Sequence, residues 1–142
     1  MIEEVFELPL APACMTVSPR GTYLFGVSPD EKPQNRAVEV SKVGESKPFP
    51  TLSISQAVKE EPVVLDAVRG MVTDSYGIVW MLDNGRRSEI PVKLVSWDYG
   101  HKKLHRVVYI VAPAVLPSSA PVDIAMDPEF PFVYLADQAR GN

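Results

Sequence analysis

The sequence predicts an all-β fold assembled from repeated antiparallel hairpins, and three observations carry this prediction. The chain of 142 residues contains 14 prolines, about twice the usual share of roughly 5%, and proline breaks helices and is confined to turns and sheet edges. Three stretches share one design: an apolar run, a Ser or Asp, a turn of Pro, Gly or Ser, and a second apolar run. The residues that open these turns are 56 and 53 positions apart, at Ser18, Asp74 and Asp127.

Repeats of this length are typical of β-propellers, in which each blade contains four strands. We therefore expect a partial β-propeller of about two and a half four-stranded antiparallel blades. Blade 1 is predicted at residues 13–54, blade 2 at 67–111, and the first hairpin of blade 3 at 120–142. The whole chain, 1–142, is thus expected to be a single unit, an incomplete propeller.

The first blade is predicted to begin with a hairpin over residues 15–25. There the Ser18 side chain can bond the turn backbone while Pro and Gly set the turn dihedrals. A third strand is expected at Arg36–Val40 and a fourth at Phe49–Ile54, followed by a single helical turn at Ser55–Lys59.

The second blade shows the pattern more clearly. Its hairpin spans Met71–Asp83, and two further strands are expected at Val92–Trp97 and Leu104–Ile110, joined by a turn at 98–102. The second of these strands alternates partly and then runs apolar, which predicts a buried strand. The hairpin of blade 3 is expected at Ile124–Asp137.

Composition narrows the possible partners. With 14 Lys and Arg against 18 Asp and Glu the net charge is −4, so neither a nucleic acid nor an anionic membrane is expected as a partner. The most apolar stretch, Val107–Leu116, is half the length of about 20 residues that a bilayer requires. Cys14 is the one cysteine, which excludes an internal disulfide. The acidic N-terminus predicts a soluble chain with no signal peptide, and the localisation stays open.

The hairpin of blade 2 resembles a known family. The segment Gly70–Gly85 is similar to the signature hairpin of the major royal jelly protein and Yellow family, where apolar-Val-Asp-x-x-Gly leads into Trp-Val-Leu-Asp-x-Gly. The resemblance covers about residues 13–139. Further matching segments follow in the family's order, at Pro91–Asp98, His101–Val111, Ala120–Asp127 and Val133–Asp137.

This resemblance implies a six-bladed β-propeller, related in architecture to gluconolactonase-like propellers, with a site at the mouth of the central channel. The chain would be its N-terminal portion, since six blades need more than twice this length. Family members are often secreted, and their activities include dopachrome conversion and the binding of small amines. The implied function is binding of a small polar ligand, with lactone hydrolysis or ring isomerisation as candidate reactions. The alternatives are a non-catalytic binding or structural propeller, or an inactive truncated reading frame.

Residues just before each hairpin can converge at the channel mouth, and the charged ones there are Asp66, Arg69 and Asp123. Asp66 and Asp123 are the candidate catalytic pair, acting as acid and base or as oxygen ligands of a divalent cation. Arg69 is the candidate ligand-binding residue, which would orient a carboxylate or enolate. In the other interpretation the two carboxylates bond turn backbone and Arg69 pairs with one of them.

The remaining polar residues are predicted to be structural. The asparagines that help bind metal in lactonase-like propellers are missing, so no cofactor is identified and a divalent cation is only a candidate. Arg86 and Arg87 are interpreted as a solvated pair in a loop rather than a phosphate-binding pair, and Cys14 as a small buried hydrophobe rather than a nucleophile. Open blade edges predict self-association, because closure is what removes exposed edges in such folds.

Overall fold

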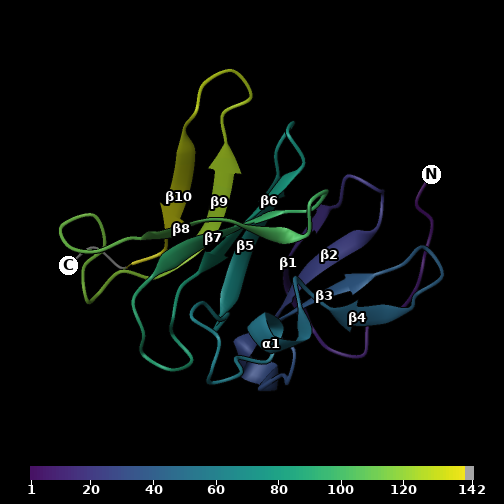
Figure 1. The fold of residues 1–142 in the computed structure, drawn as a ribbon, viewed down its shortest axis with the longest axis horizontal. Coiled ribbons are helices and arrows are strands. Elements are labelled where there is room, and N and C mark those ends of the chain that lie inside the picture. Colours follow the sequence, from purple (N-terminus) through teal and green to yellow (C-terminus); the bar gives the residue numbers. More distant parts are fainter. Residues whose placement is uncertain (140–142) are drawn as a thin grey trace.

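The computed structural model describes residues 1–139, and its strands form three antiparallel sheets that lie side by side (Figure 1). The first sheet has the order β1-β2-β3-β4 and the second β5-β6-β7-β8, while the third is the hairpin of β9 and β10. The first sheet contains β1 (Pro12–Val17), β2 (Tyr23–Val27), β3 (Ala37–Val40) and β4 (Ser46–Pro48). The predicted all-β, partial propeller fold is confirmed.

The second and third sheets follow the expected pattern closely. Their strands are β5 (Val68–Thr73), β6 (Ile78–Asp83), β7 (Lys93–Asp98), β8 (Lys103–Tyr109), β9 (Pro121–Met126) and β10 (Val133–Asp137). Two short helical segments complete the chain, the 3-10 turn η1 (Pro29–Glu31) and α1 (Leu52–Ser55). Consecutive strands pair in sequence order within every sheet, which is the connectivity of propeller blades.

The three hairpin turns are built in the same way. In each, the side chain of the predicted turn-opening residue accepts hydrogen bonds from backbone amides two to four positions ahead. Ser18 Oγ accepts from Arg20 and Thr22, Asp74 Oδ1 from Tyr76 and Ile78, and Asp127 Oδ1 from Glu129 and Phe130. A side chain that replaces a turn's missing backbone bonds fixes where the two strands meet, so the sequence repeat is also a structural repeat.

The hydrophobic core lies between neighbouring sheets rather than within one. The larger cluster joins the first two sheets through residues such as Leu24, Val68 and Val95. A smaller one joins the second sheet to the third through Leu82, Leu94 and Ile124, among others. The innermost strand β5 packs against both β1 and β9. Burying apolar faces between adjacent blades is what holds the blades in order.

Glycine allows the inner strands to come close together. A Cβ on Gly26 would lie 2.6 Å from Cys14 Sγ and 2.8 Å from the Val68 carbonyl oxygen, and one on Gly70 would lie 3.1 Å from Asp123 Cα. Only a residue without a side chain fits at such a close approach. The starts of β5 and β9 are therefore tightly packed against their neighbours.

Two predictions about individual strands are wrong. The fourth strand of the first sheet is Ser46–Pro48, and residues 52–55 instead form the helical turn α1, where the Thr51 side chain accepts a bond from the Ile54 amide. The strand expected to be buried at Leu104–Ile110 is β8, the exposed outer strand of its sheet. In both cases the pattern of apolar residues does not distinguish a strand buried within a sheet from a helical turn or an outer strand.

Candidate binding cleft between the first two blades

Loops from two blades meet at one end of the sheets. The loop after β2 carries η1, the loop after β6 carries residues 84–92, and β5 begins at the same end. In an antiparallel blade the start of the inner strand and the loop between the second and third strands share one end. These segments line a cleft of about 580 Å³, which we call the basic cleft. Its lining residues are Pro29, Asp30, Lys32, Arg69, Asn84, Arg86 and Arg87.

The charges in the basic cleft are unbalanced. Four cationic side chains line it against a single carboxylate, that of Asp30. Within residues 1–139, none of the four lies within 4.0 Å of an acidic group. This local excess of positive charge stands in a chain whose net charge is −4, so it does not reflect the average composition of the protein.

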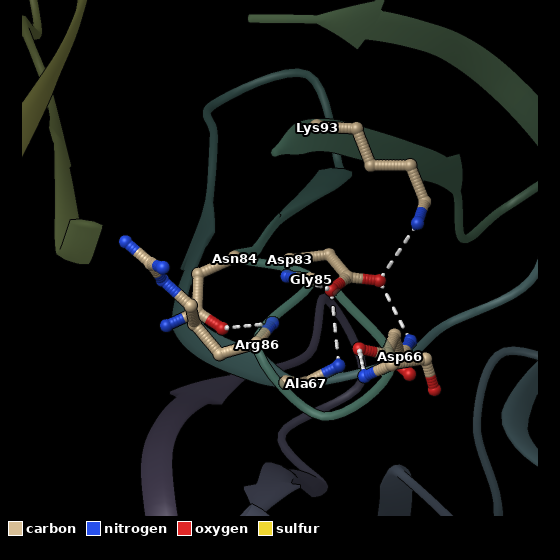
Figure 2. A network of polar contacts seen from close by, with 8 residues as sticks. Asp66, Ala67, Asp83, Asn84, Gly85, Arg86 and Lys93 are labelled. Atoms are coloured by element: carbon tan, nitrogen blue, oxygen red, sulfur yellow. Dashed lines mark hydrogen bonds and ion pairs between the residues drawn. The ribbon is translucent and has the colours of Figure 1, made fainter. Parts of the chain in front are cut away.

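A buried charge network lies beside the cleft (Figure 2). The Asp83 side chain is fully buried and pairs with Lys93, whose Nζ lies 2.9 Å from Asp83 Oδ2. The same carboxylate accepts bonds from the amides of Asp66 at 2.7 Å, Ala67 at 3.0 Å and Gly85 at 3.0 Å. A buried charge is tolerated only when it is paired and hydrogen-bonded, and Asp83 meets both conditions.

The loop after β6 is held by its own backbone and by neighbouring side chains. Asp66 Oδ2 accepts a bond from the Ser88 amide at 3.0 Å, and Asn84 Oδ1 accepts one from the Arg86 amide at 3.2 Å. Gly85 has a φ of +65°, and a Cβ there would lie 2.0 Å from the Ile90 carbonyl oxygen. The loop therefore requires glycine at this position.

Two further contacts tie this loop to the other blades. The buried Asn84 donates through Nδ2 to the Pro121 carbonyl at the start of β9, at 3.1 Å. Arg87 donates to the Pro33 carbonyl in the loop after β2, at 2.8 Å. The Arg86 side chain extends away from the Asp83 carboxylate (Figure 2). The loop is thus anchored on both sides, and its charged residues reach the cleft from a fixed backbone.

The three predicted site residues have different surroundings. Arg69 is half-buried and lines the basic cleft. Asp66 is buried beside the cleft, where one oxygen is used by the Ser88 amide. Asp123 is exposed on β9, and its Oδ1 accepts a bond from the Ile124 amide at 2.8 Å. Both carboxylates bond backbone groups, whereas Arg69 makes no ion pair within the described residues.

Sequence reasoning missed most of the basic cleft. Lys32 lies in no motif, and Asn84 is predicted only as part of the family-like segment Gly70–Gly85. The signal that was present is the Arg86-Arg87 pair directly after the Asp-Asn-Gly turn. Arg86 is exposed, in keeping with a solvated side chain, but Arg87 is half-buried and hydrogen-bonded.

Two other groups near the inner strands have shifted pKa values. Burial raises the pKa of the Cys14 thiol to about 12, so this cysteine is protonated at neutral pH and unsuited to act as a nucleophile. Burial, and next the charge of Arg87, lower the pKa of Arg36, while Asp66 and Asp83 raise it. Arg36 thus lies close enough to Arg87 to experience its charge.

Neither a metal site nor a membrane-spanning helix is found among the described residues. Among residues 1–139, no group of three or more His, Cys, Asp or Glu side chains is placed to hold a metal ion. The helical segments in this range are too short to cross a bilayer. No known protein-family model matches the chain, and no curated protein matches it either.

Proposed function

We propose that this chain is part of a propeller similar to those of the major royal jelly protein and Yellow family. We propose further that this propeller binds a small polar ligand in the basic cleft. The observation that carries the proposal is the basic cleft, which unites Arg69 with loops from two blades. Its volume of about 580 Å³ is in the range of small-molecule sites, roughly 300–1,000 Å³.

Two residues of the family-like segment, Trp80 and Asp83, support the resemblance because each makes defined contacts. Trp80 donates through Nε1 to Asp74 Oδ2 at 3.0 Å, which ties the second strand of the hairpin to its turn. Asp83, the acidic residue of the Trp-x-Leu-Asp-x-Gly match, is the centre of the buried network. A motif whose members stabilise one fold supports shared architecture more than shared chemistry.

The hydrogen bonds and positions of the Asp66 and Asp123 carboxylates favour binding over catalysis. Asp66 and Asp123 each use an oxygen on a backbone amide, and neither lines the basic cleft. A general base must be within hydrogen-bond reach of the proton that it removes. Lactone hydrolysis or ring isomerisation by this pair remains the second candidate, and Asp123→Ala tests it: turnover of a lactone that disappears in this variant would establish the catalytic version.

The proposed function is tested by titrating the full chain with small polar compounds and measuring binding calorimetrically. We propose γ-butyrolactone as a neutral lactone, tyramine as an amine, and citrate and inorganic phosphate as anions. At least one should bind saturably, and Arg69→Gln should weaken that binding. Arg106→Gln is the matched control, because Arg106 is an exposed arginine on β8 outside the cleft. If none of the four binds, or if both variants bind equally, the proposal is contradicted.

We also propose that the open edge of the third sheet associates with a second copy of the chain. Within residues 1–139, β10 is hydrogen-bonded on one side only, to β9. The exposed side chains of Phe130, Phe132 and Tyr134 lie on this hairpin. An unpaired strand with apolar side chains is a ready site for pairing with another strand.

A further inference from the structure

We propose that the ligand of the basic cleft is a small oxyanion with at least two negative charges, recognised through the arginine side chains. This inference rests on the proposed function and specifies its ligand. Four cations gather in one cleft beside a single carboxylate, that of Asp30, and among the described residues none of the four makes an ion pair within 4.0 Å. Like charges brought together reduce the stability of a compact protein, so a bound anion is the partner that offsets their repulsion.

The Arg87 guanidinium and the loop backbone around it are held in place before any ligand binds. Arg87 is tied to the Pro33 carbonyl, and the backbone that carries it is bonded by Asp66 and Asn84. Asn84 is itself held by β9. Groups that are already ordered lose less conformational entropy on binding. The basic cleft therefore has a fixed loop backbone and one fixed guanidinium, which is the kind of support that a binding site requires.

The identity of the cations points to oxyanions. Three of the four are arginines, and the planar guanidinium matches carboxylate and phosphate groups through paired hydrogen bonds. A further arginine lies close by: Arg36 experiences the charge of Arg87, and its Nε is buried without a hydrogen-bond partner in the described structure. More than one guanidinium is available, so the ligand needs more than one negative charge to balance them.

Other ligand classes fit less well. An amine would be repelled by four cations, and a neutral lactone would leave their charges unbalanced. A nucleic acid is disfavoured because the surrounding chain is acidic, with a net charge of −4, whereas nucleic-acid surfaces are broadly basic. Carboxylates and phosphates share the required chemistry, and the experiment distinguishes them.

The test is isothermal titration calorimetry of the full chain with citrate and, separately, with inorganic phosphate. We expect saturable binding that weakens as the salt concentration rises. Arg69→Gln and Arg86→Gln should each weaken binding at least tenfold, whereas Arg106→Gln should leave it unchanged. Thermal unfolding of each variant checks that it remains folded. Tighter binding of citrate would assign polycarboxylates, and tighter binding of phosphate would assign phosphorylated compounds; both results support an oxyanion.

Three outcomes would overturn the inference, and they separate it from the proposed function. Binding of γ-butyrolactone or tyramine without binding of either anion leaves the proposed function standing and removes the oxyanion. Anion binding that is equal in Arg69→Gln and Arg106→Gln would show that it occurs outside the basic cleft. Absence of binding for all four compounds contradicts both proposals.

Discussion

Two charged regions lie side by side at the end of the blades that carries η1 and the loop after β6. They differ in whether their charges are paired. In the buried network, Asp83 and Lys93 are matched one to one and every oxygen of the carboxylate is hydrogen-bonded. In the basic cleft, four cations face one carboxylate. Matched, buried charges support the fold, while unmatched charges at an open cleft are available to a ligand. Removing a charge should therefore have opposite effects in the two regions.

The largest expected loss of unfolding free energy comes from breaking the buried ion pair of Asp83 and Lys93. Lys93→Met leaves the Asp83 carboxylate buried without its cation, and we expect the free energy of unfolding to fall by about 3–5 kcal/mol. Denaturant unfolding measures this change. The double variant Asp83→Asn with Lys93→Met should lose less than the two single variants combined, because it leaves no unpaired charge. A loss of less than about 1 kcal/mol for Lys93→Met would contradict the structural role of the network.

The next largest loss of unfolding free energy is expected from a change in the loop that connects the two regions. Gly85→Ala forces a side chain into a left-handed conformation and against the Ile90 carbonyl, so we expect a loss of about 1–3 kcal/mol in unfolding free energy. The displaced loop should also weaken anion binding through Arg86 and Arg87. Ser88→Ala is the control, since Ser88 is exposed and its contact uses the backbone amide. If Gly85→Ala and Ser88→Ala have the same unfolding free energy, the close approach of position 85 to the Ile90 carbonyl is contradicted.

A second buried carboxylate, that of Glu39, extends the comparison to the hairpin-turn end of the blades. Burial opposes the charge of Glu39, but hydrogen bonds from Thr22, Tyr99 and Lys47 outweigh it and hold its pKa below the ordinary value of 4.5. A carboxyl whose pKa is lower in the folded state stabilises the protein above its unfolded pKa. That stabilisation is lost as pH falls from about 4.5 through the folded pKa.

Tyr99→Phe removes one of these bonds, which joins the second blade to the first. We expect it to reduce the unfolding free energy at neutral pH by about 1–2 kcal/mol, and by less at a pH below the folded pKa of Glu39. Denaturant unfolding at several pH values checks this. Glu39→Gln should itself show a weaker decline in stability below pH 4.5. A decline as steep as that of the unmodified chain would contradict the assignment to Glu39.

The smallest expected change in unfolding free energy is a gain rather than a loss. Arg86→Gln removes one of the mutually repelling cations of the basic cleft, so in low salt and without ligand we expect a gain of about 0.2–0.5 kcal/mol in unfolding free energy. The gain should shrink as salt screens the repulsion. Arg106→Gln provides the baseline. Destabilisation by Arg86→Gln would mean that this arginine is already paired, as in the buried network.

Self-association is tested separately by analytical ultracentrifugation. We expect the chain to form dimers through the edge of β10, and Tyr134→Lys to shift it toward the monomer, since charge on an edge strand opposes pairing. Tyr109→Lys, at an equally exposed aromatic residue on β8, is the control. A chain that remains monomeric at every concentration would contradict this proposal.

The sequence was most informative where local chemistry decides the structure. The turns opened by Ser18, Asp74 and Asp127 could be predicted because each side chain acts on its own turn. The fourth strand of the first blade could not, because β4 is polar and exposed, while the apolar residues after it bury Ile54 through a helical turn. Outer strands carry little burial, so apolar patterning identifies them poorly.

The candidate site could be predicted only in part for a related reason. Arg69 was found because it precedes a hairpin, and it does line the basic cleft. Lys32 and Arg86 come from loops after the second strands of two blades, and no spacing in the sequence joins them. Their proximity depends on how blade 1 packs against blade 2, and on contacts such as that of Arg87 with the Pro33 carbonyl.

Binding of an oxyanion in the basic cleft is best tested by an NMR titration of the isotope-labelled chain with citrate. We predict saturable shifts of the backbone amide signals concentrated at Lys32, Arg69, Arg86 and Arg87, with β8 unaffected. The same titration of Arg69→Gln should require at least tenfold more citrate to reach the same shifts. Shifts that are absent, or that appear mainly on β8 and other surfaces away from these loops, would contradict the account.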